Sequence, residues 1–114
     1  MKIMQINAVC GQGSTGRICT DIAEELEKCG HKCRVLYASG SSNFKDSIKI
    51  VDDKSLKKNA LFARITGLTA YGAIKESKRI ISKIEEFTPD VVHLHNLHGN
   101  YVNINYLLKY LGDK

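Results

Sequence analysis

The residues with the clearest chemical potential form a glycine-rich stretch, Gly11-x-Gly13-x-x-Gly16. It lies between an apolar run at residues 3–9 and a segment with helical periodicity. Glycines at this spacing permit unusual backbone angles and let another group approach the main chain closely. A strand, a glycine-rich turn and a helix N-terminus together favour an anion, because free amides and the helix dipole both attract negative charge. The stretch predicts a phosphate site with Ser14 or Thr15 capping the helix, and the alternative is a tight turn that binds nothing.

The glycine spacing matches the dinucleotide-binding fingerprint, but the acidic residue that completes the fingerprint is missing. That residue belongs at the end of the second strand, where it holds the ribose hydroxyls. The corresponding residues 36–40, Leu-Tyr-Ala-Ser-Gly, contain no carboxylate, which disfavours a nicotinamide or flavin. The stretch is not a Walker A motif either, because Arg17 and Ile18 follow Gly16 in place of lysine and serine or threonine. We therefore expect no cofactor.

A second group of polar residues, His93-Leu-His95-Asn96-Leu-His98, follows an apolar run near the C-terminus. Strand alternation places His93 and His95 on one face, at the end of the strand where open α/β folds bind ligands. Three imidazoles can bind zinc, but no carboxylate or thiolate lies close by in the sequence, so we expect no metal. His93 is expected to be a buried, hydrogen-bonded histidine, whereas His95, Asn96 and His98 are expected to line a polar cleft.

Hydrophobic periodicity predicts the elements that position these two groups. Strands are expected at residues 2–8, 32–38, 48–51 and 91–95, and helices at 15–29, 55–66, 73–87 and 104–111. Strands that alternate with helices predict an α/β fold, a Rossmann-like parallel sheet with flanking helices. The inward face of the first helix is expected to hold Ile18, Ile22, Ala23, Leu26 and Cys29, and that of the second Leu56, Ala60, Ala63 and either Leu61 or Ile65.

The net charge of +5 over 114 residues is unevenly distributed. From Lys54 to Lys83 the chain holds eight lysine and arginine residues against Glu76 alone. Such a block suits an anionic partner, either a phosphorylated ligand, a lipid surface or nucleic acid. The alternative is a solvated helical face, which we prefer over nucleic acid because aromatic residues do not interleave the cations. We expect no nucleic-acid partner and keep peripheral membrane contact through this block as a candidate.

The cysteines and the N-terminal residues indicate the cellular compartment of the protein. The four cysteines form no C-x-x-C pair, which favours reduced thiols. Cys10, beside a helix N-terminus, is either a reactive thiol or a buried inert one, and we expect the second. No apolar run approaches the ~20 residues of a membrane span, and the first residues are too polar for a signal peptide. The expected location is the cytoplasm, with the inner face of the membrane as a peripheral site.

Four segments in this order resemble the N-terminal part of bacterial family 4 glycosyltransferases. They are Met1-Lys-Ile-Met-Gln-Ile-Asn7, Gly11-Gln-Gly-Ser-Thr-Gly-Arg17, Asp21-Ile-Ala-Glu-Glu-Leu26 with Cys29-Gly-His31, and Pro89-Asp-Val-Val-His-Leu-His-Asn-Leu-His-Gly99. The similarity runs along nearly the whole chain and is weakest across residues 40–72. The paired glycine and histidine motifs carry most of its specificity.

The resemblance implies a GT-B architecture, in which two Rossmann-like domains face a cleft, and a retaining transfer of a hexose from a nucleotide-sugar donor. It implies that the glycine loop approaches the donor diphosphate through Gly11, Gly13, Ser14, Thr15 and Gly16, with Arg17 near the phosphates. His95, Asn96 and His98 would then lie near a saccharide or lipid-linked acceptor, as in the assembly of a surface polysaccharide. Stabilisation of the departing nucleoside diphosphate by backbone amides agrees with this reading.

The family continues into a strand with a His-Asp element and a whole donor domain, neither of which occurs in these residues. We therefore expect residues 1–114 to form an incomplete N-terminal, acceptor-side domain whose catalytic histidine lies beyond residue 114, and which does not transfer sugar alone. An incomplete sheet should expose the edge of the 91–95 strand and self-associate through it. The alternative is a stand-alone Rossmann-like module that binds a phosphate or a nucleotide.

Overall fold

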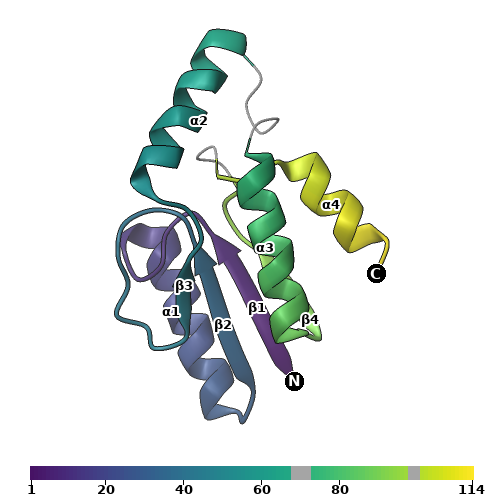
Figure 1. The fold of residues 1–114 in the computed structure, drawn as a ribbon. Coiled ribbons are helices and arrows are strands. Elements are labelled where there is room, and N and C mark those ends of the chain that lie inside the picture. Colours follow the sequence, from purple (N-terminus) through teal and green to yellow (C-terminus); the bar gives the residue numbers. More distant parts are fainter. Residues whose placement is uncertain (68–72, 98–100) are drawn as a thin grey trace.

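The computed structural model describes residues 1–67, 73–97 and 101–114 as an α/β fold with one parallel sheet (Figure 1). The strands are β1 (Lys2–Asn7), β2 (Lys32–Tyr37), β3 (Ser47–Lys49) and β4 (Val91–Leu94). The helices are α1 (Gly13–Lys28), α2 (Asp53–Thr66), α3 (Ile74–Phe87) and α4 (Ile104–Gly112). Each element lies within a few residues of its predicted position, so the predicted α/β class with a Rossmann-like parallel sheet is confirmed.

The strand order in the described residues is β3-β2-β1-β4, with every pair parallel. The chain builds outward from β1 to β2 and β3, and then returns to place β4 on the other side of β1. The order therefore reverses between β1 and β4, and the carboxyl ends of all strands meet at one edge of the sheet. In open α/β sheets, that edge at the point of reversal is where ligands bind.

The two faces of the sheet bury different side chains because strand residues alternate. On one face, Met4 and Ile6 are fully buried and pack in a cluster with Ile80 and Ile84 of α3 and Leu107 of α4. On the other face, a smaller cluster combines residues of β1 and β2 with α1; its buried members are Ile3, Cys10, Cys19, Ala23, Cys33, Val35 and Tyr37. Helices thus cover both faces, which explains why every residue of β1 after Lys2 is buried.

The buried face of α1 differs from the predicted one. Gly16, Cys19 and Ala23 are buried, whereas Ile18 is 51% exposed and Cys29 is exposed. A Cβ on Gly16 would lie 3.1 Å from both the Gly11 nitrogen and Val9 Cγ2, so the helix start packs directly on the glycine loop. This contact turns Gly16, and the helical stripe that continues from it, toward the sheet and leaves Ile18 outside.

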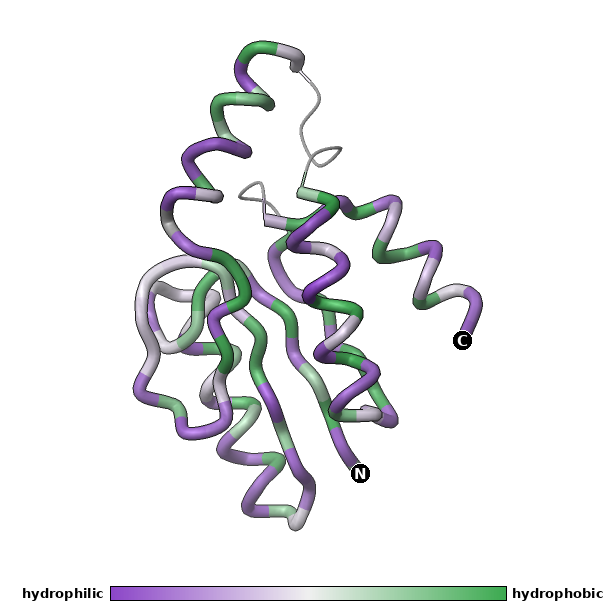
Figure 2. Tube along the Cα trace, in the orientation of Figure 1, coloured by the Kyte–Doolittle hydropathy of each residue, from purple (hydrophilic) through white to green (hydrophobic). Residues whose placement is uncertain are grey.

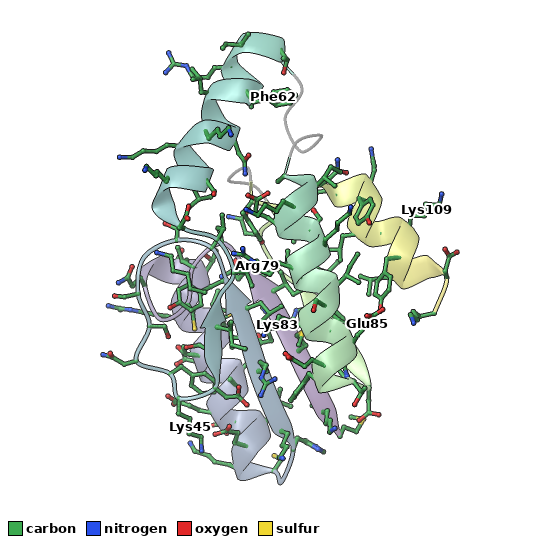
Figure 3. The ribbon with its side chains drawn as sticks, viewed as in Figure 1. Lys45, Phe62, Arg79, Lys83, Glu85 and Lys109 are labelled. Carbon is green, nitrogen blue, oxygen red and sulfur yellow. The ribbon has the colours of Figure 1, made fainter. Side chains whose placement is uncertain are left out.

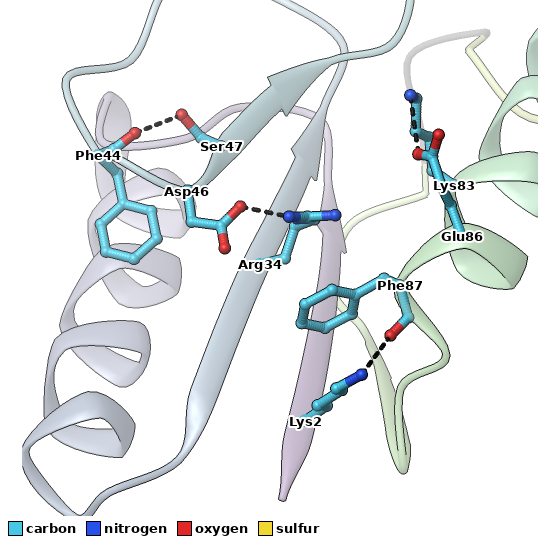
Figure 4. A network of polar contacts seen from close by, with 8 residues as sticks. All are labelled: Lys2, Arg34, Phe44, Asp46, Ser47, Lys83, Glu86 and Phe87. Atoms are coloured by element: carbon cyan, nitrogen blue, oxygen red, sulfur yellow. Dashed lines mark hydrogen bonds and ion pairs between the residues drawn. The ribbon is translucent and has the colours of Figure 1, made fainter.

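The C-terminal end of α3 is held at the amino-end edge of the sheet (Figure 4). Lys2 Nζ donates to the Phe87 carbonyl at 3.2 Å, and the Arg34 guanidinium lies 4.5 Å from the centre of the Phe87 ring. Arg34 Nε also pairs with Asp46 Oδ1 at 2.7 Å, which links β2 to the turn before β3. The helix ends two residues before Pro89, as the sequence predicts.

Helix α2 begins earlier than predicted, because Asp52 Oδ1 accepts a hydrogen bond from the Ser55 amide and caps it. It ends at Thr66, and its cap residue Gly67 has a φ of 69°, which suits glycine. Residues 68–72, which separate the two predicted helices 55–66 and 73–87, lie outside the described residues. Hydrophilic and hydrophobic residues alternate along α2, and β1 and β2 also carry hydrophilic residues between hydrophobic ones (Figure 2). No helix in the described part of the chain has the length and apolar composition to cross a membrane.

The packing of α3 on the sheet can be tested by shortening one side chain. Ile80 is 0% exposed, so we expect Ile80→Ala to lower the free energy of unfolding by about 2–5 kcal/mol, through lost burial and the cavity that remains. Ile65, which is 75% exposed, offers the matched control, and Ile65→Ala should change the free energy of unfolding by less than about 0.5 kcal/mol. Urea unfolding measures both, and equal effects would contradict this assignment of the core.

The self-association expected from the sequence stays a prediction, and β4 is the strand that tests it. Within the described residues, β4 pairs with β1 alone, and Val91 is 42% exposed. We expect dimers to increase with concentration in analytical ultracentrifugation, and Val91→Lys to reduce them, because an edge lysine opposes strand pairing. A monomer at every concentration would contradict the prediction.

Candidate functional site

The glycine loop connects the carboxyl end of β1 to α1, and each glycine has a structural use. Gly11 and Gly13 adopt positive φ angles of 75° and 65°, which other residues rarely accept. Gly16 allows the close contact with Gly11 and Val9, and its carbonyl accepts a hydrogen bond from the Gly11 amide at 2.9 Å. The loop therefore folds tightly back on the first turn of the helix.

No side chain at the N-cap of α1 accepts a hydrogen bond from the amides of the first turn. Gln12 occupies the N-cap position without a side-chain hydrogen bond, and the first turn contains no acidic residue. The prediction that Ser14 or Thr15 caps the helix is wrong, because α1 begins at Gly13 and both residues lie inside its first turn. Gly13 and Ser14 are exposed, as is Arg17 one turn later. Exposed amides at the positive end of a helix dipole, beside an arginine, can bind an anion.

Two buried side-chain amides on β1, Gln5 and Asn7, connect the glycine loop and α1 to the His95–Asn96 segment after β4. Neither residue was among the site residues predicted from the sequence. Gln5 Nε2 donates to the Cys19 carbonyl of α1 at 2.9 Å and to Cys33 Sγ of β2 at 3.3 Å. Gln5 Oε1 lies 2.6 Å from His95 Nε2. A carbonyl can only accept, which fixes the orientation of the Gln5 amide, so His95 Nε2 must donate to Gln5 Oε1.

Asn7 makes the second connection. Its Nδ2 donates to the Val9 carbonyl at 2.8 Å, at the start of the glycine loop, and its Oδ1 accepts from the Asn96 amide at 3.2 Å. The Tyr101 hydroxyl donates to the Asn96 carbonyl at 2.7 Å. One fully buried side chain thus links the loop after β1 to the residues after β4. The signal for Gln5 and Asn7 was available in the sequence, as two amides in an otherwise apolar strand.

His93 and His95 differ in burial, and the prediction that His93 is buried is wrong. Their rings stack with centroids 4.0 Å apart, so they do share a face of β4, but His93 is exposed and His95 is the partly buried, hydrogen-bonded one. The reason is that α1 packs on β1 and β2, which leaves the same face of β4 open at His93. Asn96 is also partly buried beside His95. His98, the third predicted cleft residue, lies outside the described residues.

His95 is suited to accept a hydrogen bond or a proton. Burial, and to a smaller extent the nearby His93, lower the pKa of His95 below the ordinary value of 6.5. The ring is therefore neutral at pH 7, with its proton on Nε2 and its lone pair on Nδ1, which accepts no hydrogen bond from the described residues. A hydroxyl group of a ligand could donate to that nitrogen.

Two cavities flank the glycine loop. One of about 520 Å³ lies between α1 and residues 41–45; Gly11, Gln12 and Phe44 line it, together with the carboxylates of Glu24 and Glu27. Lys45 pairs with Glu27 at 3.5 Å and leaves the lining acidic, which makes this cavity unsuitable for phosphate. The other, of about 410 Å³, lies between the ends of β1 and β2 and helix α2, and its lining is mostly apolar. The open amides of α1 remain the better anion site.

The cysteines do not add a reactive group to the site. Cys10 is fully buried, its Sγ accepts from Ser42 Oγ at 3.1 Å, and burial raises its pKa. The expectation of a buried thiol at this position is confirmed. Burial, with Cys10 and Cys33 nearby, raises the pKa of Cys19 to about 12. Among the residues described, no three histidine, cysteine or acidic side chains are placed to hold a metal ion together.

The neutral state of His95 predicts a pH dependence of stability. Its folded pKa is lower than its unfolded pKa, so the unfolded chain binds the proton more readily, and the free energy of unfolding should decrease as the pH falls through 6.5. His95→Gln keeps an N–H for Gln5 without titrating, and should flatten this part of the profile in urea unfolding at several pH values. His93→Gln should retain most of the dependence, because burial is the larger cause. An unchanged slope for His95→Gln would contradict the assignment.

Comparisons with known proteins assign no family to the chain. No family model matches it, and neither does any curated protein or solved structure at a significant level. The functional interpretation therefore depends on the residues and their geometry.

Proposed function

We propose that this chain is the acceptor-side, N-terminal part of a glycosyltransferase that moves a hexose from a nucleotide-sugar donor to a saccharide or lipid-linked acceptor. The observation that carries the proposal is the link through Asn7 between the glycine loop and the His95–Asn96 segment. This link lies at the carboxyl edge of the sheet, where the strand order reverses between β1 and β4. The motif resemblance adds the GT-B architecture, which belongs to the proposal.

The donor diphosphate would bind at the start of α1. The amides of Gly13, Ser14 and Thr15 belong to a helix end without a capping side chain, and Arg17 supplies a positive charge; Gly16 contributes by its close packing on Gly11. Transfer of the sugar leaves negative charge on the departing nucleoside diphosphate. Fixed amide dipoles stabilise that charge without reorganising, which lowers the barrier to the reaction.

The acceptor would lie against the segment after β4. His95 Nδ1 can accept a hydrogen bond from an acceptor hydroxyl, since Nε2 is already engaged by Gln5. The Asn96 backbone is held at its amide by Asn7 and at its carbonyl by Tyr101, which fixes the segment next to the loop. The acceptor and the donor phosphates would then meet at one edge of the sheet.

Binding of nucleoside diphosphates to the ¹⁵N-labelled chain tests the proposal. We expect UDP or GDP to shift the amide resonances of residues 13–17 and, to a smaller extent, those of His95 and Asn96. The affinity should be weak, because this half of the cleft offers only the phosphate contacts. Arg17→Gln should lower the affinity by about tenfold, the loss expected for a hydrogen bond to a charged group.

Lys109→Gln is the matched control, because it removes an equal charge from an exposed position on α4 and should not affect binding. Tight binding of UDP or GDP by this chain would favour the stand-alone phosphate or nucleotide module over the glycosyltransferase. If neither nucleotide shifts residues 13–17, both functions are excluded. Binding of NAD in preference to UDP and GDP would contradict the absence of a nicotinamide cofactor.

A further inference from the structure

Helix α2 presents large apolar side chains to the solvent. Leu61 is 56% exposed, Phe62 43% and Ile65 75%. The prediction that Leu61 or Ile65 faces the core is wrong, because the inward face of α2 consists of Leu56, Ala60 and Ala63. The small side chains of Ala60 and Ala63 face the rest of the protein, and the larger side chains in the C-terminal half of α2 are exposed to solvent.

The same helix is basic. Lys54, Lys57, Lys58 and Arg64 are all exposed, and residues 54–67 contain no acidic side chain. Among the described side chains, which do not include that of Asp53, none of these four cations forms an ion pair. In contrast, two cations of α3 are engaged: Arg79 donates to the Ile50 carbonyl at 2.7 Å and Lys83 pairs with Glu86 at 3.0 Å. Two of the four cations of α3 are therefore engaged within the fold, whereas no ion pair is found for those of α2 among the described side chains.

Apolar and basic residues share one side of α2. Lys54, Lys58, Leu61 and Ile65 follow one another at spacings of four, three and four residues, which places them on one helical stripe. The lysines occupy the N-terminal half and the apolar residues the C-terminal half, which stands away from the sheet (Figures 1 and 3). Phe62 is seen on that outer part of the helix (Figure 3).

We propose that α2 binds the surface of an anionic phospholipid bilayer. Leu61, Phe62 and Ile65 insert among the headgroups, while the neighbouring lysines contact lipid phosphates. A basic amphipathic helix is typical of membrane surfaces. A membrane fits better than a protein partner because three of the four cations are lysines, a residue type depleted in protein interfaces but effective near anionic lipids.

This orientation brings the candidate site to the lipid surface. Helix α2 follows β3, so its first turn lies at the carboxyl edge of the sheet, which also holds the glycine loop and His95. If the proposed glycosyltransferase function holds, an acceptor linked to lipid would approach the molecule from the side of that edge. Membrane binding itself does not depend on that function.

Cosedimentation with lipid vesicles tests the proposal on the whole chain. We expect binding to vesicles of phosphatidylcholine with phosphatidylglycerol, weak binding to phosphatidylcholine alone, and loss of binding at high salt. Ile65→Ser should lower the partition coefficient by about tenfold, as expected for an exposed apolar side chain that becomes buried. Lys58→Gln should lower it by about fivefold at low salt.

Leu108→Ser is the matched control, because Leu108 is 48% exposed on α4 and should not contact the vesicle. Circular dichroism and urea unfolding check that each variant remains folded. Equal binding to neutral and anionic vesicles, or unchanged binding by Ile65→Ser, would overturn the proposal. If Ile65→Ser instead abolishes self-association while vesicle binding is unchanged, the face is a protein interface. The UDP titration reports on the glycine loop separately, so either proposal can fail alone.

Discussion

The arrangement of the site depends on two amide side chains buried in the central strand β1. Gln5 and Asn7 are both 0% exposed, and a buried amide without partners costs several kcal/mol. Their partners come from α1, from β2, from the start of the glycine loop and from the residues after β4. These elements must keep their relative positions if both amides are to remain satisfied. The distance between the glycine loop and His95 is therefore fixed by the interior of the sheet.

Alternation along β1 explains why polar contacts of this kind are compatible with a stable core. Residues at even positions, such as Met4 and Ile6, face α3 in the larger apolar cluster. Residues at odd positions, including Gln5 and Asn7, face α1, where the apolar cluster is smaller. His95 bonds to Gln5 and therefore shares this second face. One face of the strand thus supplies hydrophobic stabilisation, while the other positions the site.

The sequence predicted the strands, their parallel class and the glycine loop, because these depend on local patterns that the fold preserves. It predicted only part of the inward face of α1 and α2, with Ala23 and Ala63 correct and the larger Ile18 and Ile65 wrong. Ile18 and Ile65 are exposed because Gly16 and the alanines of α2 allow closer packing than a large side chain would. It also placed His93 in the interior, although His93 is exposed, because burial on β4 depends on how far α1 extends across the sheet. Which side chains are buried depends on how the helices pack over the sheet, and the periodicity of the sequence carries no information on that packing.

Charge around the carboxyl edge of the sheet decides where an anion can bind. Glu24 and Glu27 make one side of the glycine loop acidic, so a phosphate placed in that cavity would meet two carboxylates. The opposite sign is found at the helix start beside Arg17 and along α2, whose first turn lies at the same edge. An anion near this loop is therefore repelled on the side of Glu24 and Glu27 and attracted on the side of the α1 start and Arg17. The charge pattern thus favours the helix start over the acidic cavity as the place for a phosphate.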